Sequence, residues 1–332
     1  MPNKKQPWYK NYKQWKTAAD QYMKAAVFSS LSSEQQSEVI SYGNNSIIRL
    51  IFESNRIEGA GTKTLGETER MLEQLKKKYK IDINEITFTR ETDVFSIFET
   101  KNSEVQVTKY GKSFKEYKEV MQHWSTVISS MLLGDQFLKY RNSEICFPLF
   151  SEKQIKAWHE ILARGLTEPA GEYRREPVFL KEVLDLTFPN HELLDKIMDS
   201  FCNRANRLID KGLSDPNADK FMIAAQITYE FVRIHPFVDF NGRTSRIFLR
   251  MIMQIFGLNF SVILRGNKKA KDRYMWALKH ANAIKDPENF DTRHLEPYAT
   301  LIAMAVCDGF KQINANLRLA GLPTIGTDVE IN

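Results

Sequence analysis

Apolar side chains recur every three or four positions along most of the chain, as they do on one face of an α-helix. In residues 33–58 this spacing places Ile47, Leu50 and Ile51 on one broad face, and Gly-Ala-Gly at 59–61 ends the predicted helix. The same periodicity predicts further helices over 114–140, 151–164, 192–212, 217–234, 242–256, 269–284 and 294–318.

The sequence TLGE, from Thr64 to Glu67, has the pattern of a capping box. In that motif the side chains of the first and fourth residues each bond to the other's backbone N–H. The pattern predicts that a new helix begins here and continues through Met71 and Leu75.

Two segments break the helical pattern. Residues 80–110 are rich in Ile, Val, Phe and Thr with alternating polarity, which predicts a small β-hairpin or three-stranded insertion. Residues 165–192 look extended and include GEYRREPVFL, which begins at Gly171. The predicted class is mainly α with one or two β-hairpins, divided into an N-terminal helical region (1–112), a core (113–300) and a C-terminal helix and tail (301–332).

The composition fits a globular protein. The 332 residues are 42% hydrophobic and 27% charged, which is enough for a substantial core. The polar, basic start lacks the apolar segment of a secretory signal, and no apolar run is long enough to span a bilayer. The widely spaced Cys146, Cys202 and Cys307 predict reduced thiols in a cytoplasmic protein.

The net charge of +6 raises the question of a nucleic-acid partner. The lysines cluster in residues 1–16 and 76–78, and no motif that reads RNA or DNA accompanies them. This distribution favours a solvated basic surface over a nucleic-acid interface.

The stretch 235–246, HPFVDFNGRTSR, concentrates polar groups between two apolar segments. Pro236 prevents the preceding helix from continuing, and Asn241-Gly242 is a turn signal after which a helix resumes. His235 lies at the break and is the only group of the stretch that exchanges a proton near neutral pH.

The helix that resumes after this turn offers unpaired N–H groups and its positive dipole end to an anion. Arg243 and Arg246, three residues apart, share a face and can reach the same phosphate chain. Asp239 suits such a site when Mg²⁺ bridges its carboxylate to phosphates. Each feature alone is more often structural, but their coincidence indicates phosphoryl or nucleotidyl transfer.

HPFVDFNGRTSR resembles the Fic family signature, H-x-F-x-(D/E)-G-N-G-R-x-x-R, at every defined position but one. Phe240 stands where the family commonly has Gly. The resemblance implies a Fic-type helical core with a β-hairpin flap over 171–180. It also implies a protein adenylyltransferase that moves AMP from ATP to a Ser, Thr or Tyr hydroxyl. The target protein would dock along the flap by strand addition, and the family also allows self-modification and a homodimer.

The resemblance implies a role for each residue of the signature. His235 would deprotonate the target hydroxyl, Asp239 would hold Mg²⁺, and Arg243 would stabilise the phosphates. Phe237 would be a buried anchor. The nucleotide and its phosphates would be contacted by Phe240, Asn241, Gly242, Arg243, Arg246 and Tyr274, of which Tyr274 borders the base.

The segment SNRIEG is similar to an inhibitory pattern of the same family, (S/T)-x-x-x-E-(G/N), through Ser54, Glu58 and Gly59. The resemblance implies an inhibitory helix over about 44–59, in which Glu58 pairs with Arg246 and excludes the γ-phosphate. An acid near a helix C-terminus is slightly unfavourable by itself, which is a reason to expect a cationic partner.

Three alternatives to an autoinhibited adenylyltransferase remain. Relatives of the family transfer phosphate, UMP or phosphocholine, or remove AMP from proteins. Phe240 favours a catalytically weak nucleotide-binding module, because it restricts φ and adds bulk where Gly brings N–H groups close to phosphates. A metal-dependent hydrolase built on His235 and Asp239 is the weakest, since the other histidines show no ligand spacing.

Overall fold

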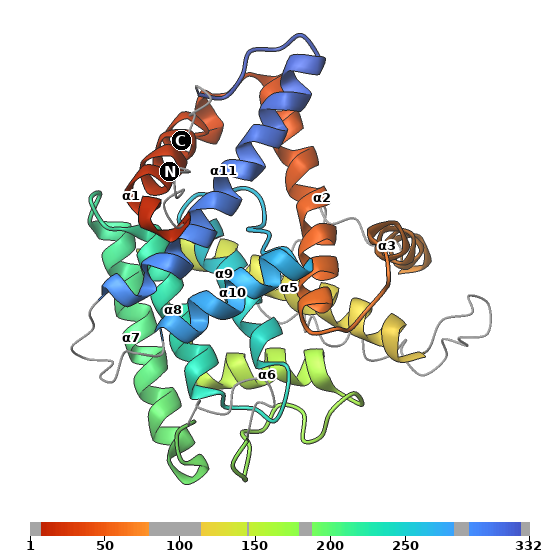
Figure 1. The fold of residues 1–332 in the computed structure, drawn as a ribbon, viewed down its shortest axis with the longest axis vertical. Coiled ribbons are helices and arrows are strands. Elements are labelled where there is room, and N and C mark those ends of the chain that lie inside the picture. The colour runs from red at the N-terminus through yellow and green to blue at the C-terminus, as the bar shows by residue number, and fades with distance from the viewer. Residues whose placement is uncertain (1–7, 80–113, 145, 179–187, 282–291, 327–332) are drawn as a thin grey trace, which may run out of the picture.

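A computed structural model describes residues 8–79, 114–144, 146–178, 188–281 and 292–326. The β insertion expected at 80–110 lies outside these residues, as does the end of the flap beyond 178. The α-helices are α1 (Tyr12–Ala25), α2 (Ser33–Ile57), α3 (Leu65–Tyr79), α5 (Phe114–Tyr140), α6 (Glu152–Ala163), α7 (Leu194–Ser214), α8 (Lys220–Ile234), α9 (Asn241–Ile255), α10 (Lys268–Ala281) and α11 (Glu296–Leu319) (Figure 1). Short 3₁₀ turns occur at Trp8–Asn11, Phe28–Ser30, His191–Leu193 and Thr292–Leu295.

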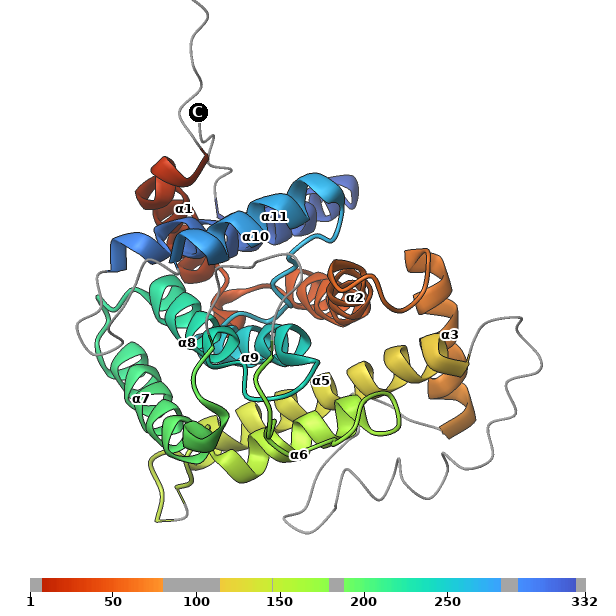
Figure 2. The same ribbon diagram turned by 60° about the horizontal axis from the view of Figure 1, so that its bottom comes forward.

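The predicted mainly α class is confirmed, and α8 and α9 form the centre of the fold. α9 packs against α8, α5 and α2, as Figure 2 shows. Nearly all of its residues are buried, and Phe248, Met251 and Ile252 are fully so. Because several helices surround α9, the residues of its first turn have a defined position. Among the described helices, none combines the length and apolar run that crossing a bilayer requires.

A second group of buried apolar residues surrounds the start of α9. Ile47 and Leu50 of α2, Trp124 of α5 and Ile247 of α9 belong to it, together with Phe240 from the preceding loop. This cluster packs the C-terminal half of α2 against the start of α9. The candidate site lies where these two helices meet.

The start of α3 confirms the predicted capping box. Thr64 N donates to Glu67 Oε2 at 3.2 Å, and Glu67 N donates to Thr64 Oγ1 at 3.3 Å. The reciprocal bonds satisfy N–H groups that the first helical turn leaves free, so α3 begins at Leu65.

The sequence patterns gave no helix between residues 12 and 25, where the structure has α1. This helix packs along α11 through a buried face that includes Ala18, Ala19 and Tyr22. Its inward residues Tyr12, Trp15, Ala19 and Tyr22 do have helical spacing, although the lysines and other polar residues between them make the segment polar on average.

The described residues contain no strand. Residues 171–178, where the family resemblance implies part of a β-hairpin flap, form bends and coil instead. Their backbone bonds to neighbouring elements instead of to a second strand. Gly171 N donates to His159 Nδ1 at 2.9 Å, and Arg174 N donates to the Pro236 carbonyl at 2.9 Å. This segment is therefore attached to α6 and to the loop before α9.

Candidate active site

The loop between α8 and α9 holds two residues in the left-handed region, His235 (φ 50°) and Phe240 (φ 62°). Such backbone costs about 1 kcal/mol or more outside glycine, so the surroundings must hold it. Arg174 does so from outside the loop. Its Nε donates to the His235 carbonyl at 2.8 Å, and its backbone N bonds to Pro236.

The buried side chain of Asn241 holds the same loop from within. Its Oδ1 accepts from Phe237 N at 3.0 Å, and its Nδ2 donates to Phe237 O at 2.8 Å. Both of its polar atoms are thus engaged with the loop backbone. Asn241 shapes the site in this structure, and its expected contact with phosphate stays a prediction.

His235 is buried and has the properties of a neutral base. Its Nδ1 lies 3.2 Å from the Val232 carbonyl, which can only accept, so Nδ1 carries the proton and Nε2 keeps a lone pair. Burial lowers the pKa of His235 to about 4, against a smaller opposite effect of the Val232 carbonyl. The imidazole is therefore unprotonated near neutral pH, as a general base must be.

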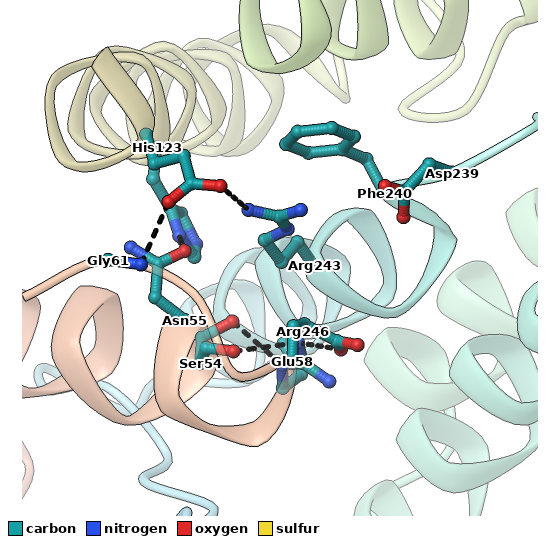
Figure 3. Close-up of polar contacts among 10 residues, drawn as sticks. Ser54, Asn55, Glu58, Gly61, His123, Asp239, Phe240, Arg243 and Arg246 are labelled. Atoms are coloured by element: carbon teal, nitrogen blue, oxygen red, sulfur yellow. Dashed lines mark hydrogen bonds and ion pairs between the residues drawn. The ribbon is translucent and has the colours of Figure 1, made fainter. Parts of the chain in front are cut away.

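The end of α2 places Ser54 and Glu58 against Arg246 (Figure 3). Arg246 is only 2% exposed; its Nε donates to Ser54 Oγ at 2.7 Å, and its Nη2 donates to Ser54 O at 3.0 Å and Glu58 Oε1 at 2.5 Å. Burial alone would raise the pKa of Glu58, but Arg246 and Arg243 outweigh it and lower that pKa. The structure thus pairs Glu58 with Arg246, as the family resemblance implies, and adds Ser54 as a second partner of this arginine.

Glu58 also lies against Gly242. A Cβ at Gly242 would be 2.6 Å from Glu58 Oε1, so glycine leaves room there for an anion. The first turn of a helix attracts anions through its free N–H groups and its dipole. Gly59 (φ 70°) adopts the left-handed backbone directly after Glu58, which lets α2 end at this point. A protein carboxylate therefore occupies the place where a phosphate is expected.

Arg243 is buried and points away from Arg246 in Figure 3. Its guanidinium carbon lies 3.5 Å from the centre of the Phe240 ring, and its Nη1 lies 3.7 Å from Glu119 Oε1. Within the described part of the chain, Nε and Nη1 of Arg243 have no hydrogen-bond partner. The ring of Phe240 belongs to the buried cluster at the start of α9.

Asp239 is exposed at the end of the loop, and its Oδ1 accepts from Phe240 N at 2.6 Å. No group of three His, Cys, Asp or Glu residues that could hold a metal ion occurs among the described residues. Mg²⁺ does not need such a group, because one carboxylate plus substrate phosphates and water is a common mode. The exposed carboxylate beside an anion site fits that mode.

An open hollow of about 330 Å³ lies at this site, lined by residues that include Glu58, Gly61, Asp239 and Arg243. Tyr274 is not part of its lining. It is buried on α10, with its ring 5.8 Å from that of Tyr298, so the expected contact with a base stays a prediction. A larger hollow of about 560 Å³ lies elsewhere, between the end of α1 and the end of α9.

His159 on α6 supports the loop, although no sequence pattern assigned it a role. Its ring stacks on Phe237 at 3.7 Å. Its Nδ1 accepts from Gly171 N, so its Nε2 carries the proton and donates to the Asp239 carbonyl at 3.2 Å. Burial lowers the pKa of His159 to about 4. In the sequence, the one feature that could have indicated this role is that His159 lies on the apolar face of its helix.

α5 contributes two further residues that the sequence patterns did not single out. Glu119 Oε2 accepts from Gly61 N at 2.8 Å, and His123 Nδ1 lies 3.2 Å from Asn55 Oδ1. One turn apart on α5, they contact the end of α2 and the loop after it. Thr126 and Ser130 follow them at helical spacing, so the sequence of α5 does not distinguish Glu119 and His123 from its other polar residues.

Comparison with known proteins gives the family of the chain. The Fic/DOC family model matches residues 149–253, which contain the loop and most of α9. A Fido domain-containing protein of Dictyostelium discoideum is 30% identical over 156 residues, which are 47% of this chain and 99% of that protein. The chain therefore belongs to the Fic/DOC family.

Other relatives are named protein adenylyltransferase Fic. One from Nematostella vectensis is 33% identical over 159 residues, and one from Drosophila willistoni is 29% identical over 183 residues. These matches cover 46% and 54% of this chain, and 32% of each relative. The chain thus spans about a third of the length of these two enzymes.

Two solved structures have a similar fold. A Fic domain containing signaling protein from Bacteroides thetaiotaomicron has a TM-score of 0.63 at 17% identity, covering 94% of this chain and 99% of that chain. Fic-1 from C. elegans has a TM-score of 0.62 at 18% identity, covering 94% of this chain and 73% of that chain. At these identities the likeness concerns the fold.

Proposed function

We propose that this protein moves AMP from ATP to a hydroxyl group of a protein. The observation that carries the proposal is that His235, which burial keeps neutral, ends α8 just before the loop that leads into α9. Asp239 of that loop and Arg243 and Arg246 of the first turns of α9 lie at the same helix N-terminus (Figure 3). Relatives named protein adenylyltransferase support AMP as the transferred group and ATP as the donor.

In the proposed reaction, Nε2 of His235 takes the proton of the target hydroxyl while that oxygen attacks the α-phosphorus. The bond between the α-phosphorus and its bridging oxygen breaks, and pyrophosphate leaves. Arg243 and Arg246 bind the phosphates and stabilise their charge. Asp239 would hold Mg²⁺, which supplies further positive charge to the phosphates when bound.

Glu58 makes this enzyme autoinhibited in the proposal. Its carboxylate pairs with Arg246 and lies against Gly242, so it competes with the donor for both a cation and a helix N-terminus. A donor phosphate can take that position only after Glu58 has left it. Ser54 holds Arg246 from α2 through two further bonds, which keeps the guanidinium in place for either anion.

The test uses purified Glu58→Gly protein, Mg²⁺ and ATP radiolabelled at either the α- or the γ-phosphate. AMP transfer predicts that label from the α-phosphate alone stays on protein, with a mass increase of one adenylate. Label from the γ-phosphate alone would show phosphoryl transfer instead. The double variant with His235→Ala is the control and is expected to bind ATP without transferring label.

The target protein is proposed to lie along residues 171–178. This segment is bonded to the loop through Arg174, and it carries the exposed charged side chains of Glu172 and Arg175. A chain placed there would bring a hydroxyl next to His235, because Arg174 contacts the His235 carbonyl. Cross-linking of a probe at Glu172→Cys to a labelled target would test this placement.

A further inference from the structure

The second arginine contact of the site involves Glu119, which the family signature does not contain. Glu119 and Arg243 are each 5% exposed, and Glu119 Oε1 lies 3.7 Å from Arg243 Nη1. Glu119 comes from α5, directly before Val120 and Met121 of the buried cluster around the start of α9, and it lines the open hollow at the site. Besides Asp239 of the loop, the site therefore has two acids from other elements, Glu58 and Glu119, each of which pairs with one arginine of α9.

Arg243 is incompletely bonded in this arrangement. The distance to Glu119 is too long for a hydrogen bond, and Nε and Nη1 of Arg243 have no partner among the described residues. The guanidinium carbon lies over the Phe240 ring, 3.5 Å from the ring centre, which is a cation–π contact. A buried cation with free donors gains more from a new anion than a fully bonded one does, because unsatisfied buried donors are costly.

Glu119 also contacts the loop that follows Glu58, through its other oxygen. Oε2 accepts from Gly61 N at 2.8 Å, three residues after Glu58. Gly61 has φ 74°, and a Cβ there would come within 2.8 Å of Asn55 Cβ, so the loop fits closely on α2. One carboxylate thus connects the arginine of the phosphate site to the loop that carries Glu58.

We propose that Glu119 is a second inhibitory acid: it holds Arg243 against Phe240, competes with donor phosphates for that arginine, and ties it to the loop after Glu58. It is a positioning residue, since it acts through Arg243. The inference rests on the proposed function in one respect, namely that Arg243 receives the phosphates of the donor. It adds a second carboxylate whose attraction for an arginine the donor phosphates must outweigh.

The test measures binding of inorganic tripolyphosphate by calorimetry, with Mg²⁺, in the Glu58→Gly background. This probe has the phosphate chain of any nucleoside triphosphate but no base, so the result does not depend on ATP being the donor. Glu119→Gln removes the charge beside Arg243 and keeps an oxygen that can accept from Gly61 N. The control is Asp135→Asn on the same helix, which removes one negative charge and keeps an acceptor for Gln254.

Glu119→Gln is expected to bind tripolyphosphate about three- to tenfold more tightly, which is typical of removing one competing charge. Asp135→Asn is expected to leave the affinity unchanged. The proposal would be overturned if Glu119→Gln bound tripolyphosphate no more tightly than its parent, or if both variants bound it more tightly to the same extent. It would also be overturned if no variant bound tripolyphosphate. A purely structural role of Glu119 predicts a lower melting temperature without tighter binding. If tripolyphosphate binds tightly but no AMP is transferred, the proposed function fails and this inference stands.

Discussion

The guanidinium carbon of Arg243 lies over the ring of Phe240, 3.5 Å from the ring centre. This contact defines what the phenylalanine does in place of the usual glycine. The ring is 3% exposed and packs with residues of α2 and α5, while the backbone keeps the left-handed φ of 62° that glycine would adopt freely. The side chain thus contributes to the core and to the position of Arg243, at the cost of backbone strain.

Phe240→Gly is therefore expected to destabilise the protein and not to improve donor binding. Loss of a buried Phe ring costs about 3–5 kcal/mol, and relief of the left-handed strain offsets roughly 1 kcal/mol of it. The measurements are urea unfolding and ATP affinity in the Glu58→Gly background. Phe240→Leu is the control that keeps apolar volume and loses the aromatic face. Tighter ATP binding without loss of stability would mean that the ring obstructs the donor.

Glu58→Gln is expected to raise AMP transfer about tenfold or more, because a neutral amide no longer neutralises Arg246. The same change is expected to lower the free energy of unfolding by roughly 1–2 kcal/mol, since Arg246 loses a partner that is itself partly exposed. Initial transfer rates and urea unfolding measure the two effects. Glu53→Gln, an acid on the same helix that can keep an acceptor for Gly266 N, should leave the rate at its basal level. Equal rates for both variants would refute the inhibitory role of Glu58.

The helices and the loop chemistry could be predicted because they depend on local patterns. The capping box at Thr64, the helix break at Pro236 and the turn at Asn241 each involve residues within four positions of one another. The pairing of Glu58 with Arg246, 188 residues apart, came from a family pattern and not from spacing.

Other parts of the site could not be predicted because they depend on tertiary packing. Glu119 meets Gly61 across 58 positions, and nothing near either residue indicates the other. The direction of the Phe240 ring is set by a cluster built from α2, α3 and α5, so the sequence left open whether it faced the nucleotide or the core. The role of His159 could not be predicted either. In the sequence it is a histidine on an amphipathic helix, and only the fold brings its ring against Phe237.

The pH profile of transfer should show an acid limb well below the ordinary pKa of histidine. The pKa of His235 is lowered to about 4, so its base form persists on acidification until that range is reached. In Glu58→Gly protein, protonation of His235 is therefore expected to cause no fall in kcat/KM between about pH 7 and about pH 5.5. Initial rates over this range test it. A limb near the ordinary histidine pKa of about 6.5 would show that His235 is solvated or is not the base.

The stability of the protein should fall as the pH drops, and His159 should account for part of that fall. Its pKa is lowered from 6.5 to about 4 in the folded protein. Below the unfolded value, the unfolded chain binds a proton that the folded chain does not, so stability present above about pH 6.5 decreases until about pH 4. For His159 the loss between about pH 7 and about pH 5.5 is of the order of 1 kcal/mol. Urea unfolding at the two pH values measures it, and His159→Gln should flatten the dependence by that amount. An unchanged pH dependence in the variant would place a charged His159 in the folded protein, which its stacking on Phe237 and its bond from Gly171 N do not allow.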